Sequence, residues 1–95
     1  MEKNRTCFSR GKGVAHKEME SKSVLLCLES GHYYTLNSTG TFIWSLLDGK
    51  SGLDRIAQRV AERFHVSREE AVRDVRDLVE DLEAEGLLER YRGPE

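Results

Sequence analysis

The sequence predicts a small α+β domain, a three-stranded antiparallel sheet followed by three helices. Strand-like segments occupy the first part of the chain, and helical apolar periodicity begins near residue 41. The 95 residues are 38% hydrophobic and 34% charged, which suits one small core and excludes a two-domain enzyme or a disordered chain. We expect residues 1–12 to be a flexible basic tail and residues 13–92 to form the domain.

The predicted sheet consists of a hairpin and a third strand. Residues 14–19 alternate weakly in polarity, residues 20–22 are polar and turn-like, and residues 23–29 are an apolar run. After a turn at Ser30-Gly31, residues 32–36 carry aromatic and β-branched side chains. Such side chains favour a strand, so this segment is predicted to complete a meander.

Alternation divides the third predicted strand between two faces. His32, Tyr34 and Leu36 share one face, whereas Tyr33 and Thr35 share the other. We expect Leu36 to point inward, Tyr34 to help close the core and Tyr33 to be exposed. His32 follows the glycine turn and is interpreted as a solvated loop residue.

The first predicted helix begins after the turn at Asn37-Ser38, where both residues are good N-caps, and stops at Asp48-Gly49. Apolar side chains lie on most sides of residues 41–47, so this helix should be almost surrounded by protein. Trp44 is therefore interpreted as a core residue and not as a platform for a ligand.

The second predicted helix opens at Ser51, with Asp54 three residues later as an approximate capping box. Its apolar residues recur at intervals of three and four, which places them on one face. They are Leu53, Ile56, Ala57, Val60, Ala61 and Phe64.

The third predicted helix begins with a capping box at Ser67 and Glu70 and ends at Gly86, which can adopt the left-handed conformation that closes a helix. A narrow arc of apolar residues forms its core seam. The seam consists of Ala71, Val75, Leu78 and Leu82. Residues 87–91 then add a short terminal strand or an apolar clasp.

The two margins of this helix differ. Val72 and Val79 lie to one side of the seam, with Arg76 and Glu83 beyond them. The opposite margin is acidic and carries Asp74, Asp77 and Asp81. In one interpretation the valines widen the core stripe and the aspartates are a solvated face. In the other, the valine edge lines a groove, with Arg76 and Glu83 as polar contacts at its lip.

Charge and cysteine content restrict the possible partners. The formal net charge is −2, and the acidic residues gather in the last third of the chain, so nucleic acid is disfavoured. Cys7 and Cys27 show neither a disulfide framework nor metal-ligand spacing, and we expect no metal or cofactor. Cys27 is interpreted as a buried structural thiol. No apolar run could span a membrane and the N-terminus lacks a secretion signal, so we expect a cytoplasmic protein.

Two helices joined by a short link after a preceding helix are typical of a winged helix-turn-helix-like unit. The same residues resemble the pyrroloquinoline quinone (PQQ) biosynthesis protein D family, and the resemblance covers residues 34–88. The resemblance depends on short motifs and helices that follow one another along the chain in the order Leu-Asn, helix, Asp-Gly, helix, Asp-Val and Gly-Leu-Leu. In this chain it reads Tyr34-x-Leu36-Asn37-x-x-Gly40-x-x-Ile43-Trp44-x-Leu46-Leu47-Asp48-Gly49, then Ile56-Ala57-x-x-Val60, then Asp74-Val75-x-x-Leu78-Val79-x-x-Leu82-x-x-x-Gly86-Leu87-Leu88.

The resemblance implies a non-catalytic element that binds the leader of a ribosomally made precursor peptide and presents it to a modifying enzyme, often a radical S-adenosylmethionine protein. In this family the leader pairs as an added strand with the third strand and rests against the third helix. An open strand edge suits that role physically, because its unpaired N–H and C=O groups can accept an extended peptide. The implied peptide-binding residues are His32, Tyr33, Tyr34, Thr35, Leu36, Val72, Arg76, Val79 and Glu83. The pathway, whether PQQ synthesis or another peptide-derived product, stays open.

Two other classes of function compete with peptide binding. A winged helix could be a DNA-binding regulator, although the acidic third helix would be repelled by phosphates. An enzyme is disfavoured, because no catalytic triad, phosphate loop or metal-ligand spacing is present. A plain structural interaction module is a third option.

Overall fold

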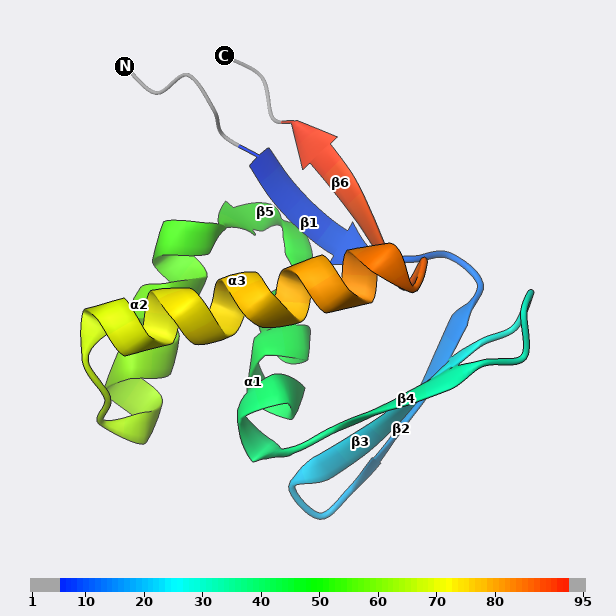
Figure 1. The fold of residues 1–95 in the computed structure, drawn as a ribbon, viewed down its shortest axis with the longest axis horizontal. Coiled ribbons are helices and arrows are strands. Elements are labelled where there is room, and N and C mark those ends of the chain that lie inside the picture. The colour runs from blue at the N-terminus through cyan, green and yellow to red at the C-terminus, as the bar shows by residue number, and fades with distance from the viewer. Residues whose placement is uncertain (1–5, 93–95) are drawn as a thin grey trace.

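The computed structural model describes the backbone of residues 6–92 and the side chains of residues 10–89. The predicted α+β architecture is confirmed: a three-stranded antiparallel sheet is followed by helices (Figure 1). The sheet contains β2 (Val14–Met19), β3 (Lys22–Cys27) and β4 (Tyr33–Leu36), in the order β2-β3-β4. The helices are α1 (Ser38–Leu46), α2 (Leu53–Phe64) and α3 (Arg68–Ala84).

A second antiparallel sheet was not predicted. It contains β1 (Thr6–Arg10), β5 (Asp48–Gly52) and β6 (Leu88–Arg92), in the order β5-β1-β6. The prediction of a tail over residues 1–12 is therefore wrong for residues 6–10, which form a strand, and residues 1–5 lie outside the described residues. The terminal strand expected near residues 87–91 is β6, and it pairs with β1, away from β4.

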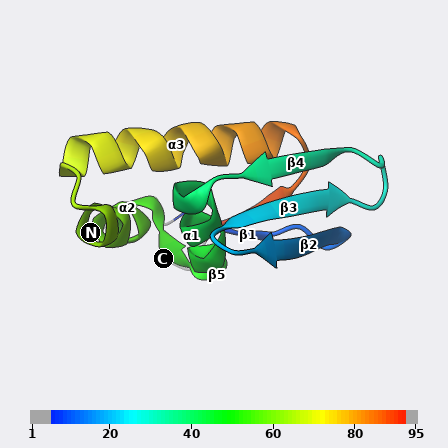
Figure 2. The same ribbon diagram turned by 90° about the horizontal axis from the view of Figure 1, so that it is seen from below.

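Helix α2 lies at the end of the molecule away from the hairpin sheet, and α3 extends from α2 toward that sheet (Figure 1). Seen from below, α3 runs alongside β4, with α1 between the sheets (Figure 2). The core contains fourteen buried hydrophobic side chains from the strands and all three helices. They are Leu25, Leu36, Ile43, Trp44, Leu47, Ile56, Ala57, Val60, Ala71, Val75, Val79, Leu82, Leu87 and Leu88.

Local signals fix three of the helix ends as expected. The side chain of Asn37 accepts a hydrogen bond from the Gly40 N–H at 2.9 Å, and that of Ser67 accepts one from the Glu70 N–H at 3.0 Å. Gly86 has φ +76°, and the Leu87 N–H returns to the Leu82 carbonyl at 2.9 Å, which closes α3.

The predicted capping box at Ser51 is wrong. Helix α2 begins after Gly52, which makes no side-chain cap, and Ser51 belongs to β5. The Asp48 carboxylate accepts the N–H groups of Lys50 and Ser51 at 2.9 and 3.1 Å, so it organises a turn instead of a helix stop. These hydrogen bonds, with that of Lys50 foremost, lower the pKa of Asp48.

The predicted apolar face of α2 is confirmed. Ile56, Ala57 and Val60 are buried, and the remaining three residues of the stripe are partly buried against the same core. Trp44 is 3% exposed and is a core residue, as expected. None of the helices within residues 6–92 combines the length and the apolar character needed to cross a bilayer.

Candidate functional site

Strand β4 has an open edge. Among the described strands it pairs only with β3, in the register Leu25↔Tyr34 and Val24↔Thr35. The Cys27 N–H donates to the His32 carbonyl at 2.9 Å. In an antiparallel pair the residues bonded to the neighbour alternate with residues that are not, so His32, Tyr34 and Leu36 bond toward β3. The N–H and C=O groups of Tyr33 and Thr35 therefore point outward, where a further strand could pair.

The side chains of β4 divide as the alternation predicts. Leu36 is buried in the core, whereas Thr35 is exposed and Tyr33 is 72% exposed. Tyr34 packs against the core and its hydroxyl donates to the Asp81 carboxylate of α3 at 3.3 Å. Burial, followed by the negative charges of Asp81 and Glu85, raises the pKa of Tyr34. Tyr34 therefore links the strand to α3.

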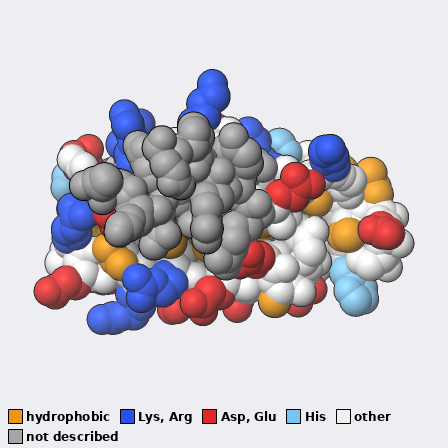
Figure 3. Space-filling model, turned by 90° about the horizontal axis from the view of Figure 1, so that it is seen from above, with side chains coloured by type: hydrophobic (Ala, Val, Ile, Leu, Met, Phe, Trp, Pro, Cys, Tyr) orange, Lys and Arg blue, Asp and Glu red, His pale blue; other side chains and the backbone are white. Residues whose placement is uncertain are grey.

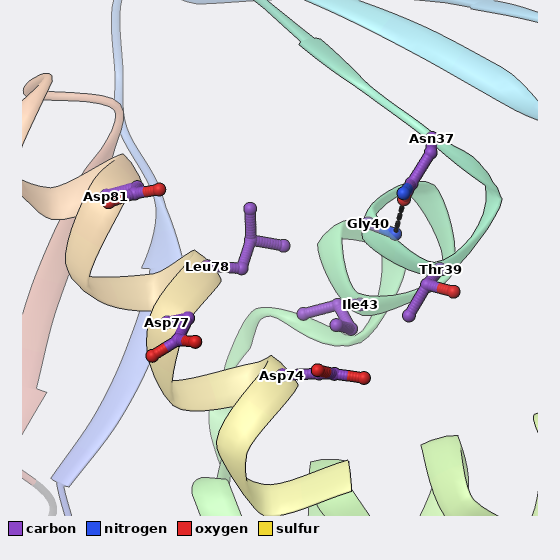
Figure 4. A pocket seen from close by; sticks show the side chains of 8 residues that line it. All are labelled: Asn37, Thr39, Gly40, Ile43, Asp74, Asp77, Leu78 and Asp81. Carbon is purple, nitrogen blue, oxygen red and sulfur yellow. Dashed lines mark hydrogen bonds between the residues drawn. The ribbon is translucent and has the colours of Figure 1, made fainter. Parts of the chain in front are cut away.

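A hollow of about 310 Å³ lies between the start of α1 and α3. Ile43 from α1 and Leu78 from α3 point toward each other across it (Figure 4). Gly40 allows α1 to approach β4 closely, since a Cβ there would lie 3.1 Å from Leu36 Cδ2. The lining residues are Asn37, Thr39, Gly40, Ile43, Asp74, Asp77, Leu78 and Asp81.

A second hollow of about 430 Å³ lies at the other end of β4, beside the β3–β4 turn. It is lined by Gly31, His32, Tyr33, Tyr34 and Glu85. Exposed hydrophobic side chains gather at this end of the molecule (Figure 3), including Tyr33 and Leu28, which is 63% exposed. We call the two hollows, together with the β4 edge between them, the β4–α3 groove.

The α3 side of the β4–α3 groove is acidic. Asp74, Asp77 and Asp81 line the first hollow and Glu85 lines the second. Among the residues that the structure describes, none of these four carboxylates has an ion-pair partner, and the Asp81 carboxylate accepts a hydrogen bond from Tyr34. The groove therefore combines the apolar side chains of Ile43 and Leu78, the outward backbone groups of β4 and four carboxylates without an ion-pair partner among the described residues.

Of the two interpretations of the α3 margins, the structure agrees with the one in which the valines pack with the core. Val79 is 3% exposed and Val72 packs against the core, so these valines widen the core stripe. Neither they nor Arg76 and Glu83 line the two hollows beside β4. Leu78, predicted as part of the core seam, is half-buried and faces α1 across the first hollow.

Sequence reasoning thus missed the acidic margin as part of the groove. The signal was present, because the three aspartates were identified as one edge of the helix. The solvated face is one of two interpretations that the sequence leaves open, because the sequence does not fix how α3 is rotated about its axis. Asn37 and Gly40 were noted only as a cap and as a motif residue, although both line the first hollow.

Cys27 differs slightly from its predicted role. It is half-buried against the core and not fully enclosed, and a hydrogen bond from Ser30 is the main cause of a lowered thiol pKa. Within the part of the chain that the structure describes, no three His, Cys, Asp or Glu side chains are grouped as metal ligands would be.

Comparisons with known proteins agree with this geometry. The family model described as coenzyme PQQ synthesis protein D (PqqD) matches residues 22–88. A protein named PqqA binding protein from Rhizobium meliloti (strain 1021) is 33% identical over 82 residues, which cover 86% of this chain and 82% of that protein.

Two solved structures share the fold over most of their length. TbiB1 in complex with the TbiA(beta) leader peptide has a TM-score of 0.78 and 31% identity, and the match covers 85% of this chain and 94% of TbiB1. A lasso peptide synthetase B1 complexed with its leader peptide has a TM-score of 0.77 and 28% identity, over 86% of this chain and 96% of that one. These similarities give no support to the DNA-binding alternative.

Proposed function

Since the chain belongs to the coenzyme PQQ synthesis protein D family, we propose that it binds the leader of a ribosomally made precursor peptide. The leader adds as a fourth strand to the open edge of β4 and lies in the β4–α3 groove. The contacts come from residues 32–36 on one side and from the groove face of α3 on the other.

The observation that carries this proposal is the outward orientation of the Tyr33 and Thr35 backbone groups beside the two hollows of the groove. Unpaired edge groups are a template for another strand, and natural proteins usually cover or charge such an edge. Here the C-terminal strand β6, which could have covered it, pairs with β1 instead. Similarity to two proteins solved with leader peptides supports a peptide as the occupant of the edge.

Backbone pairing alone would bind a leader too weakly. Two outward-facing residues supply four hydrogen bonds, and at about 0.5–1.5 kcal/mol net for each bond they contribute about 2–6 kcal/mol. A micromolar complex requires about 8 kcal/mol, in addition to the cost of association. Side chains of the leader must therefore be buried beside the strand, and the hollow between Ile43 and Leu78 is the place for one of them.

The proposal assigns binding of the leader to this chain and its chemical modification to another protein. The chain itself is non-catalytic and presents the leader to a separate modifying enzyme, which in this family is often a radical S-adenosylmethionine protein. The encounter takes place in the cytoplasm, where the ribosome releases the precursor. Whether the product is PQQ or another modified peptide is decided by the precursor.

An amide NMR titration tests the proposal. The ¹⁵N-labelled chain is titrated with synthetic leaders of precursors encoded beside it. We expect the largest shifts at residues 32–36 and along residues 74–85, which cover the C-terminal part of α3 and its C-cap. A control peptide with the same composition in scrambled order should cause smaller shifts at equal concentration.

Shifts confined to α2, on the far side of α1, would contradict the groove as the binding site. Low-salt binding to duplex DNA that is tight and salt-sensitive would favour the competing function. Turnover of any leader by the purified chain alone would contradict the non-catalytic role.

A further inference from the structure

We propose that the acidic side of the β4–α3 groove selects a leader segment in which an apolar anchor is accompanied, two residues away, by Lys or Arg. This inference rests on the proposed function and specifies the chemistry of the occupant. It goes beyond strand addition, which by itself places little demand on sequence.

The direction in which the guest side chains point follows from the sheet. A strand added to β4 alternates in phase with it, so guest residues opposite Tyr34 and Leu36 point to the same face as those two side chains. The Tyr34 hydroxyl reaches Asp81 on α3 at 3.3 Å, so this face is directed at the acidic margin. Every second guest residue therefore faces α3.

The spacing of the carboxylates matches that of a strand. Asp77, Asp81 and Glu85 follow one another at intervals of four residues, about 6 Å apart along a helix with a rise of 1.5 Å per residue. Alternate residues of a strand are about 6.6 Å apart. The C-terminal half of α3 lies beside β4, and its middle lies beside α1 (Figure 2). Successive inward-facing residues of a guest strand that runs along β4 and past its end at Leu36 would therefore lie opposite successive acidic residues.

The groove provides one apolar position within this acidic row. Ile43 and Leu78 face each other across the first hollow, and Asp74, Asp77 and Asp81 surround Leu78 on α3 (Figure 4). A leucine-sized side chain of the guest would enter between Ile43 and Leu78. Its inward-facing neighbours, two residues away, would then lie beside the aspartates.

Charge complementarity decides which neighbours are favoured. The four carboxylates have no ion-pair partner among the described residues, so a guest carboxylate would be repelled by them. The hydrogen bond from the Tyr34 hydroxyl to Asp81 places one of these carboxylates within reach of the strand. After burial, the charges of Asp81 and Glu85 contribute to the raised pKa of Tyr34. A guest ammonium or guanidinium group reduces this repulsion.

Four synthetic peptides of eleven residues test the inference. They share a threonine-rich extended sequence with one central leucine. Three carry Lys, Gln or Glu at both positions two residues from the leucine. The fourth carries Lys at both adjacent positions, so that the same charges point away from α3.

Affinities are measured by fluorescence anisotropy at about 20 mM salt, and binding at β4 is checked by amide NMR. We expect the peptide with Lys two residues from leucine to bind about tenfold more tightly than the Gln peptide and the Glu peptide to bind more weakly than both. The adjacent-Lys peptide should resemble the Gln peptide. The preference should shrink at about 0.5 M salt.

Matched variants of the chain separate the groove charges from overall charge. Asp77→Asn with Asp81→Asn should remove most of the preference for Lys over Gln, and the amide oxygen introduced at the second position can still accept the hydrogen bond from Tyr34. Glu69→Gln with Glu80→Gln removes the same charge from exposed positions on α3 outside the groove and should leave the preference unchanged.

The outcomes distinguish this inference from the proposed function. If the Gln peptide shifts the β4 amides but Lys gives no advantage, or if the adjacent-Lys peptide binds equally well, charge selection is refuted and strand addition stands. If no peptide, including the cognate leader, shifts the β4 amides, the proposed function fails as well.

Discussion

Thr35→Pro tests strand addition more directly than any other single change. The Thr35 N–H points away from β3, so proline removes a donor that the sheet itself does not use. Edge strands tolerate proline where the missing N–H faces solvent, and the preceding Tyr34 is already extended, as proline requires. The variant should therefore fold, with a thermal transition within a few degrees of the wild-type value.

The effect on binding follows from the lost donor. One net hydrogen bond disappears, and the guest carbonyl that would have accepted it is left against the proline ring. Together these cost about 1–3 kcal/mol, or about 5- to 150-fold in affinity. Thr35→Ala is the matched control, because it removes the same exposed side chain and keeps the N–H. We expect its affinity to stay within about twofold of wild type.

The assay is fluorescence anisotropy with a labelled cognate leader, and circular dichroism is recorded on each variant. Arg59→Ala, an exposed change on α2, serves as a second control and should leave affinity unchanged. If folded Thr35→Pro binds the leader as tightly as Thr35→Ala, the leader does not pair with the outer edge of β4, and the orientation argument is wrong.

Three further predictions concern stability. Leu25→Ala deletes a fully buried side chain and should lower the free energy of unfolding by about 2–5 kcal/mol in urea titrations; a loss below about 1 kcal/mol would show that the core can collapse around it. Ser67→Ala removes the cap on the Glu70 N–H and should cost about 1 kcal/mol by the same titration, whereas Ser67→Asp should retain most of the stability. The raised pKa of Tyr34 predicts a contribution to stability that is complete below pH 10 and is lost as pH rises through the folded-state pKa. The free energy of unfolding of Tyr34→Phe should therefore fall less steeply with pH in this alkaline range than that of the wild type, and equal slopes would contradict the prediction.

Features of the fold that depend on local signals could be predicted from the sequence. The caps at Asn37 and Ser67 and the left-handed Gly86 act within a few residues of where they stand, so the spacing of residue types was enough. The hairpin sheet follows from consecutive runs joined by short turns. The position of β4 as its edge follows from the same order.

The second sheet depends on pairing between distant segments. Its strands come from the start, middle and end of the chain, and β5 (Asp48–Gly52) contains two glycines and three polar residues, which carry no strand signal. Local patterns therefore assigned Asp48-Gly49 to a helix stop and Ser51 to a cap. Only the pairing with β1 makes the segment a strand.

In the candidate site, the strand side could be predicted from the sequence and the helix side could not. Alternation along β4 gave the orientations of Tyr33 and Leu36, because a strand has only two faces. A helix can rotate continuously, and both margins of α3 adjoin its apolar seam. The packing of Val79 into the core fixes that rotation, which places Asp77 in the hollow beside α1 and Asp81 next to Tyr34 of the strand.

The pairing of β1 with β6 brings Thr6 opposite Arg92, so the chain enters and leaves the domain side by side, in the sheet that does not contain β4 (Figure 1). A domain with this arrangement can be inserted into another polypeptide, or extended at either end, without obstructing the open edge of β4. Circular permutants that bridge these two positions with a short linker and open at the Glu20 turn would retain both sheets. The architecture is thus suited to a domain that is fused to, or inserted into, other proteins.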